Sequence, residues 1–306
     1  YDRLILATGS KPFVPPIPGS DLTGVLSFRD IYDVNTMIKY CETKKNAVVI
    51  GGGLLGLEAA YGLKQRGMNV TVLHLMDRIM ERQLDGRASR MLRQSIEEKG
   101  INIITEANTE ALIGKDGHVN QVRLKDGTVL DADLVVFAVG IRPNIALAQS
   151  AGLRCNRGIL VNDTMQTFDP SIYAVGECIE HRGQTFGLVE PLWGQAFICA
   201  THLAEHGSLT FKAPTVPTQL KVSGVDVFSA GNFEPKDDYE DIILNDEKRQ
   251  IYKRIIIQND RVIGAVLFGD TEDGMWYAEL IADQTPISTF RNKLLFGKDF
   301  AMKKAG

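Results

Sequence analysis

The sequence has few cysteines and no long apolar run, and these absences exclude several classes of protein. Its four cysteines form no C-x-x-C pair, so neither a zinc site nor a local redox disulfide is indicated. No apolar run approaches the roughly 20 residues that a membrane span needs. The net charge of -4 disfavours nucleic acid as a partner. With no signal peptide evident, we predict a cytoplasmic protein with reduced thiols, no membrane contact and no metal site.

What the sequence does contain is a glycine-rich loop between two apolar strands. The runs 47–50 and 70–75 are typical of buried strands, and a helical pattern extends over 54–66. The loop between the first strand and the helix, GGGLLG at 51–56, matches G-x-G-x-x-G. This order of strand, loop, helix and strand indicates a dinucleotide-binding site.

Each glycine of the motif has a physical role in such a site. Gly51 permits the tight turn, Gly53 lets a pyrophosphate approach the backbone, and Gly56 allows the helix to pack close to the strand. Leu54 and Leu55 begin the helix, whose N-terminus offers free N–H groups and partial positive charge to phosphates. These residues are therefore predicted to bind the cofactor.

The acidic residue that usually follows the second strand of this motif is absent. His74 stands there, with Asp77 and Arg78 just beyond. An acid would accept hydrogen bonds from the ribose 2′-hydroxyl of NADH, whereas a cation would favour the 2′-phosphate of NADPH. His74 and Arg78 are candidate contacts that leave the choice between NADH and NADPH open, with NADH slightly preferred.

The opening of the chain resembles a later stretch, which indicates an internal repeat. An apolar strand followed by ATGSKP, within 4–12, returns as AVGIRP after a second apolar strand, within 135–143. In the second copy the glycine loop precedes this stretch, and at the same spacing the first loop would lie before Tyr1. We therefore expect a fragment that lacks most of a first nucleotide-binding unit.

Alternating helices and strands are predicted around the glycine loop. A helix is expected over 27–40 with Asp30 as its cap, and another over 85–99 that starts at an aspartate. Strand candidates with two Lys-Asp-Gly hairpin turns follow, before a parallel strand at 133–138. This α/β domain is expected to close at about Arg157.

The next segment is expected to return to a parallel sheet. Short strands over 159–177 end in Glu177, which places a carboxylate at the carboxyl end of a sheet, where ligands bind in open α/β folds. A helix is predicted over 191–206, with a proline in its first turn. Trp193 and Phe197 on this helix are expected in the core.

From residue 211 the pattern changes to a separate α+β domain. It predicts antiparallel strands over 219–222, 225–230, 250–258 and 261–268. It also predicts helices over 274–283 and 287–292. The charged run 236–241 is expected to be a solvated loop.

Four stretches together resemble the pyridine-nucleotide disulfide oxidoreductase superfamily, which uses FAD and NAD(P)H. They are ATGSKP at 7–12, GGGLLGLE at 51–58, AVGIRPN at 138–144 and YAVGEC at 173–178. Stretches at 80–85, 177–183, 220–231 and 294–297 are similar to the flavin part of the assimilatory nitrite reductase large subunit, and to the electron-transfer subunit of assimilatory nitrate reductase.

The resemblance implies an α/β, Rossmann-like flavoprotein with two dinucleotide-binding domains, the first truncated, plus a C-terminal α+β domain. Residues 1–45 would be a remnant of the FAD-binding domain with its linker, 46–157 the NAD(P)-binding domain, 158–210 the returning FAD-binding segment and 211–306 the C-terminal reductase domain.

Site residues are implied on the positions that match the family motifs. The nicotinamide nucleotide would contact Gly51, Gly53, Gly56 and Glu58, with Val139 and Gly140 on its other side. FAD would lie beside Thr8, Gly9, Lys11 and Arg29, with Gly176 and Glu177 at its ribityl chain and Glu190 and Pro191 near its ring. A Glu in place of the commoner Asp at 177 would alter the ribityl contact.

The resemblance implies an electron-transfer module of nitrate assimilation. Hydride would pass from NAD(P)H to FAD, and electrons would continue to iron–sulfur and siroheme centres outside this chain, or to a small electron-transfer protein. Hydride transfer requires no side-chain acid or base, so no catalytic residue is predicted. A rubredoxin- or ferredoxin-type reductase, an NADH oxidase and a non-catalytic nucleotide-binding fragment stay open as alternatives.

Overall fold

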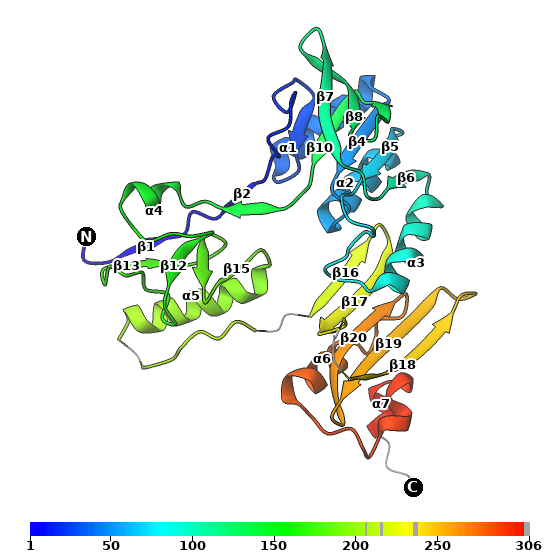
Figure 1. Cartoon of the computed structure of the whole chain (residues 1–306). Helices are drawn as coiled ribbons and strands as arrows, with labels where there is room; N and C mark the ends of the chain where they lie inside the picture. The colour runs from blue at the N-terminus through cyan, green and yellow to red at the C-terminus, as the bar shows by residue number, and fades with distance from the viewer. Residues whose placement is uncertain (206, 215–216, 235–237, 303–306) are drawn as a thin grey trace. The chain divides into compact units, whose positions relative to one another are not determined.

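The computed structural model describes residues 1–205, 207–214, 217–234 and 238–302, and the chain divides into two compact units (Figure 1). Unit 1 joins residues 1–13 to 140–216, and unit 2 joins residues 14–139 to 217–306. Each unit is therefore built from two separate stretches of chain. The domain boundaries expected at residues 45, 157 and 210 stay a prediction.

The first half of unit 2, residues 14–139, is built on a parallel sheet of order β3-β10-β4-β5-β6. Its strands are β3 (Val25–Ser27), β4 (Asn46–Ile50), β5 (Asn69–Leu73), β6 (Ile101–Ile104) and β10 (Leu134–Phe137), with helices α1 (Ile31–Thr43), α2 (Leu54–Gln65) and α3 (Gly86–Glu97) between them. Strand β10 is buried throughout, as expected of a central strand covered on both faces. The predicted strand, glycine loop, helix and second strand are confirmed.

Helix α1 starts later than predicted. The Asp30 carboxylate caps it by accepting hydrogen bonds from the N–H groups of Tyr32 and Asp33, at 2.8 and 3.0 Å. The residues before the cap were expected to be helical, but Val25–Ser27 forms strand β3 and pairs with β10. The predicted cap is right, and the predicted start at residue 27 is wrong because parallel pairing takes that segment into the sheet.

An antiparallel meander follows β6 in the same half of unit 2. It consists of β7 (Thr109–Lys115), β8 (His118–Leu124) and β9 (Val129–Asp131). Asp116 and Gly117 both have positive φ, 53° and 77°, as a two-residue hairpin turn requires. The predicted Lys-Asp-Gly turns are confirmed.

The second half of unit 2 is an antiparallel sheet of order β16-β17-β20-β19-β18, drawn from yellow to orange in Figure 1. Its elements are β16 (Thr218–Val222), β17 (Val225–Gly231), β18 (Glu240–Asp246), β19 (Ile251–Gln258), β20 (Arg261–Phe268), α6 (Gly274–Asp283), the 3₁₀ helix η1 (Arg291–Phe296) and α7 (Lys298–Met302). The α+β domain, its four predicted strands and helix α6 are confirmed.

Two expectations for this domain are wrong. Residues 240–241 begin strand β18 at the sheet edge, although the charged run 236–241 was expected to be a loop; residues 236–237 lie outside the described part. The helix expected over 287–292 is replaced by η1 and α7, which start later. Strand β18 was not predicted because edge strands tolerate charged side chains and so lack the alternation of apolar and polar residues that indicates a strand.

Unit 1 is a set of small sheets packed on one helix. It contains β1 (Leu4–Leu6), β2 (Ser10–Pro12), β11 (Ile141–Pro143), α4 (Ala146–Ser150), β12 (Ile159–Val161), β13 (Ile172–Ala174), β14 (Ile179–His181), β15 (Gln184–Thr185) and α5 (Val189–Leu203). Strands β1 and β13 pair in parallel, and β2 pairs antiparallel with β11. The segments that follow the two A-x-G motifs therefore pair with each other.

Helix α5 corrects another expectation. Trp193 and Phe197, expected in the core, are 73% and 63% exposed. The side of the helix that faces the core carries Gln195, Ile198 and Cys199 instead. Apolar residues occur all around α5, so their spacing does not show which side is buried.

Among the described residues, no helix is both long and apolar enough to cross a membrane. All four cysteines are free. Burial raises the pKa of the thiols of Cys41, Cys155 and Cys199, which disfavours the reactive thiolate form.

Candidate functional site

The glycine loop lies between β4 and α2, and its glycines are needed for different reasons. Gly51 has φ +125°, and a Cβ there would lie 2.3 Å from the Ala138 carbonyl oxygen. A Cβ on Gly56 would lie 1.8 Å from the Gly51 oxygen. A Cβ on Gly53 would meet nothing within 4 Å. Gly51 and Gly56 therefore serve the turn and the packing, whereas Gly53 keeps a space open.

That open space lies at the N-terminus of α2. Gly53 is the N-cap residue and provides no side-chain hydrogen bond to the helix. Leu54 is half-buried and Leu55 is 47% exposed. Backbone N–H groups at a helix start with an unobstructed approach fit a pyrophosphate. The loop therefore meets the steric requirement of a dinucleotide.

Of the two residues expected to wall the nucleotide, one lies next to the loop. The Val139 nitrogen is 3.3 Å from the place of a Cβ on Gly51. Gly140, the next residue, belongs to unit 1, has φ +101° and accepts a 2.9 Å hydrogen bond from the Phe13 N–H.

His74 follows β5 and is only 8% exposed. Its Nδ1 lies 3.0 Å from the Gly52 nitrogen and its Nε2 lies 3.0 Å from a carboxylate oxygen of Glu81. Sequence reasoning found His74 from its position after the strand. It missed Glu81, which lies on an irregular segment where no periodic pattern identifies a partner.

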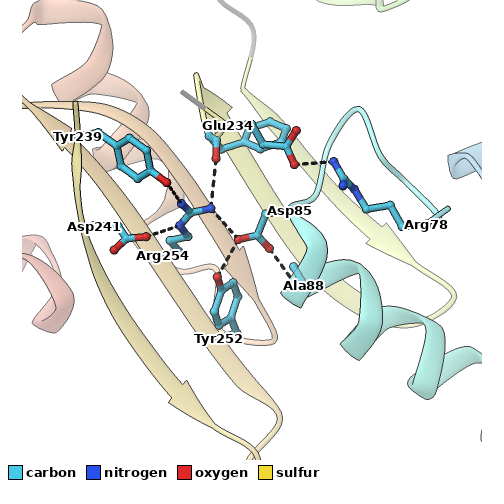
Figure 2. Close-up of polar contacts among 9 residues, drawn as sticks. Arg78, Asp85, Ala88, Glu234, Tyr239, Asp241, Tyr252 and Arg254 are labelled. Atoms are coloured by element: carbon cyan, nitrogen blue, oxygen red, sulfur yellow. Dashed lines mark hydrogen bonds and ion pairs between the residues drawn. The ribbon is translucent and has the colours of Figure 1, made fainter. Parts of the chain in front are cut away.

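Glu58 and Arg78, both expected to contact the nucleotide, are joined to the C-terminal half of unit 2. The Glu58 carboxylate accepts a 2.6 Å hydrogen bond from the Ser223 N–H, at the turn between β16 and β17. Arg78 pairs with Glu234 (Figure 2). These contacts join residues far apart in the chain, so no local signal in the sequence could reveal them.

The segments expected beside FAD meet one another inside unit 1. The Thr8 hydroxyl donates a 2.6 Å hydrogen bond to the Asn144 carbonyl, and the Asn144 N–H donates to the Gly9 carbonyl at 2.8 Å. The Ser10 hydroxyl donates to Glu177 at 2.7 Å. Asn144 and Ser10 thus fix this corner, and sequence reasoning missed both.

Gly176 is held by a residue of α5. Its N–H donates a 2.8 Å hydrogen bond to Oε1 of Gln195, a fully buried side chain. The Gln195 Nε2 is also buried and has no hydrogen-bond partner among the described residues. A buried donor of this kind costs free energy unless something accepts from it.

The remaining FAD candidates have simpler environments. Lys11 is exposed on β2, opposite Arg142 of β11. Glu190 is exposed in the first turn of α5, and Pro191 beside it is buried. Arg29 is exposed just before α1 and belongs to unit 2, unlike the other FAD candidates.

A family model described as pyridine nucleotide-disulphide oxidoreductase matches residues 1–195, well over half of the chain. The chain belongs to this family. A second model, the rubredoxin NAD+ reductase C-terminal domain, matches residues 217–285. The expected NAD(P)H-dependent flavoprotein oxidoreductase, with FAD and a nicotinamide nucleotide as cofactors, is confirmed at the level of the family.

Curated relatives are similar over almost the whole chain. A nitrite reductase [NAD(P)H] of Bacillus subtilis (strain 168) is 51% identical over 288 residues, which cover 94% of this chain and 36% of that protein. The assimilatory nitrate reductase electron transfer subunit of the same strain is 42% identical, over 96% of this chain and 38% of that subunit. The chain thus spans a little over a third of the length of these relatives.

Solved structures share the fold. A NAD-dependent persulfide reductase from A. fulgidus has a TM-score of 0.85 and 30% sequence identity, over 95% of this chain and 59% of that one. A ferredoxin reductase from Rhodopseudomonas palustris has a TM-score of 0.83 and 25% identity, over 94% of this chain and 72% of that one. The predicted Rossmann-like architecture with a C-terminal α+β domain is confirmed.

Proposed function

We propose that this chain is an electron-transfer module that takes hydride from NAD(P)H and supplies electrons for the reduction of nitrite or nitrate. The proposal rests on the open space at Gly53, at the start of α2, in a chain that is 51% identical to part of a nitrite reductase. FAD, when bound, supplies the hydride acceptor and the route to a further redox centre.

The residues of unit 2 serve to bind and orient the nucleotide. The α2 N-terminus and the Gly53 backbone hold the pyrophosphate, and Val139 limits the site beside Gly51. The nucleotide contacts that we propose in unit 2 are Gly51, Gly53, Leu54, Leu55, Gly56, Glu58, His74, Arg78 and Val139. Alignment of the two reacting groups is the main contribution of the protein, so no catalytic acid or base is assigned.

The residues of unit 1 serve to hold FAD. Gln195 fixes the Gly176 backbone by accepting a hydrogen bond from its N–H, which supports a role for Gly176 in positioning FAD. The FAD contacts that we propose in unit 1 are Thr8, Gly9, Lys11, Gly176, Glu177, Glu190 and Pro191.

We also propose an electron acceptor, guided by the relatives. The nitrite reductase and the nitrate reductase subunit suggest iron–sulfur and siroheme centres outside residues 1–306 as acceptors. The match of residues 217–285 to a rubredoxin reductase domain supports a second candidate, in which a small electron-transfer protein accepts the electrons. No metal site is proposed in this chain.

The test is a visible absorption spectrum of the purified chain, incubated with excess FAD, desalted and titrated with NADH without oxygen. A retained flavin band that bleaches supports the proposal, and reduction of added rubredoxin or ferredoxin would favour the second acceptor. Nucleotide binding without bleaching, with flavin retained, would instead favour a non-catalytic module.

A further inference from the structure

The segment after β5 holds a carboxylate beside the glycine loop in place of the acid that the motif lacks. The Met80 N–H donates a 3.0 Å hydrogen bond to the Gly52 carbonyl, and Met80 is fully buried with φ 53°. A Cβ on Gly52 would lie 2.9 Å from a methyl carbon of Ile79. Residues 79–80 are thus packed on the loop, and Glu81 follows directly.

The His74 ring fixes the direction of the Glu81 side chain. A backbone N–H can only donate, so His74 Nδ1 accepts from Gly52 at 3.0 Å and the ring proton resides on Nε2. Nε2 then donates to Oε2 of Glu81, also at 3.0 Å. His74 therefore links the loop backbone to the Glu81 carboxylate.

The second carboxylate oxygen of Glu81 has no hydrogen-bond partner among the described residues. The Glu81 side chain is 25% exposed, and its Oε1 lies 3.9 Å from Arg82 Nε, beyond hydrogen-bond distance. Arg78, the other cation of this segment, pairs with Glu234. Glu81 is therefore the charged side chain of this segment that hydrogen bonds, through His74, connect to the loop.

In dinucleotide-binding folds the end of the second strand lies next to the adenosine ribose, where an acid accepts from the 2′-hydroxyl and repels a 2′-phosphate. We infer that Glu81, positioned by His74, takes this role and makes the site selective for NADH over NADPH. The inference rests on the proposed function, since it requires a nicotinamide nucleotide at the glycine loop.

The test is the dissociation constant of NADH and of NADPH for the purified chain, measured by fluorescence titration without any turnover. Glu81→Gln keeps the size of the side chain and an oxygen that can accept from His74, so it removes the charge while the fold is preserved. We expect NADH to bind about tenfold more weakly to this variant, because a charge-assisted hydrogen bond is lost, and NADPH to bind equally well or better.

Two controls separate the possible failures. Glu98→Gln, on an exposed residue at the end of α3, should leave both constants unchanged. Gly53→Val should weaken NADH and NADPH alike. An unchanged NADH-to-NADPH ratio in Glu81→Gln overturns the role of Glu81 and leaves the proposed function standing. Wild-type chain that prefers NADPH also overturns the inference, with the exposed Arg82 as the alternative determinant. Wild-type chain that binds neither nucleotide overturns both proposals.

Discussion

The Tyr252 hydroxyl donates a 2.7 Å hydrogen bond to Asp85, across the contact between the two halves of unit 2 (Figure 2). The other oxygen of Asp85 accepts from the Ala88 N–H at 3.0 Å and caps helix α3. Arg254 lies 3.2 Å from the same carboxylate, which is almost completely buried. Burial, followed by the hydrogen bond to Asp85, raises the pKa of Tyr252, so the phenol stays protonated as the donor. One carboxylate therefore caps helix α3 and connects it to the second half of unit 2.

Replacing Asp85 should destabilise unit 2 strongly. Asp85→Ala leaves Arg254 without one of its buried partners and removes the helix cap, which should cost about 3–5 kcal/mol. Urea unfolding followed by Trp276 fluorescence, in a Trp193→Phe background, measures this loss in unit 2. Tyr252→Phe removes a single hydrogen bond and should cost only about 1 kcal/mol. Equal losses for the two variants would contradict this account.

Unit 1 should lose part of its stability at low pH through Asp163. Hydrogen bonds from Arg182 and then His181 lower the pKa of this carboxyl to about 2, from an ordinary 3.8. Because the folded-state pKa is depressed, the contribution is complete well above pH 3.8 and is lost as the pH falls towards 2.

The difference in thermal midpoint between wild type and Asp163→Asn should accordingly be largest near pH 6, and about half of it should remain at pH 3. The loss of unit 1 can be followed by Trp193 fluorescence. Asp77→Asn, an exposed aspartate in unit 2, serves as the control. A difference that stays constant between pH 6 and pH 3 would exclude the Asp163 ion pair as its source.

Substitution of Gly56 should lower the stability of unit 2, whereas substitution of Gly53 should lower the affinity for NADH. Gly56→Ala places a Cβ 1.8 Å from the Gly51 oxygen, so it should lower the stability of unit 2 by several kcal/mol. Gly53→Val places its side chain in open space, so the free energy of unfolding should change by less than about 1 kcal/mol. The affinity for NADH should nevertheless fall at least tenfold. Thermal unfolding and NADH titration of both variants decide the matter. A loss of affinity in proportion to stability would argue against a ligand at Gly53.

The thiol of Cys41 should react slowly. It lines a cavity of about 160 Å³ between α1 and α2. Its pKa is raised, mainly by burial. Because the thiolate is the reactive form, alkylation by iodoacetamide at pH 7.5 should be several times slower than that of a free cysteine and should accelerate above pH 9. Mass spectrometry of timed samples gives the rate, and a tryptic peptide containing Cys41 serves as the reference. If Cys41 in the folded chain is alkylated as fast as in the peptide, the prediction that burial slows its reaction is wrong.

Features set by neighbouring residues could be predicted, and those set by distant contacts could not. The caps Asp30 and Asp85 stand directly before their helices, and the glycine loop carries its spacing within a few residues. Strand β18 is an edge strand with charged residues, so its pattern resembles a loop. Glu81 and Gln195 gain their significance only when the folded chain brings them to Gly52 and Gly176.

Parallel pairing of β1 with β13 has a consequence for the order of folding. Leu4 pairs with Ile172, and the whole first half of unit 2 lies between them in the chain. Closing so long a loop is entropically costly unless the intervening chain has already become compact. Residues 14–139 should thus fold first and bring β2 against β11. Unit 1 can close only after Ala174 has been synthesised, so its assembly follows the folding of residues 14–139.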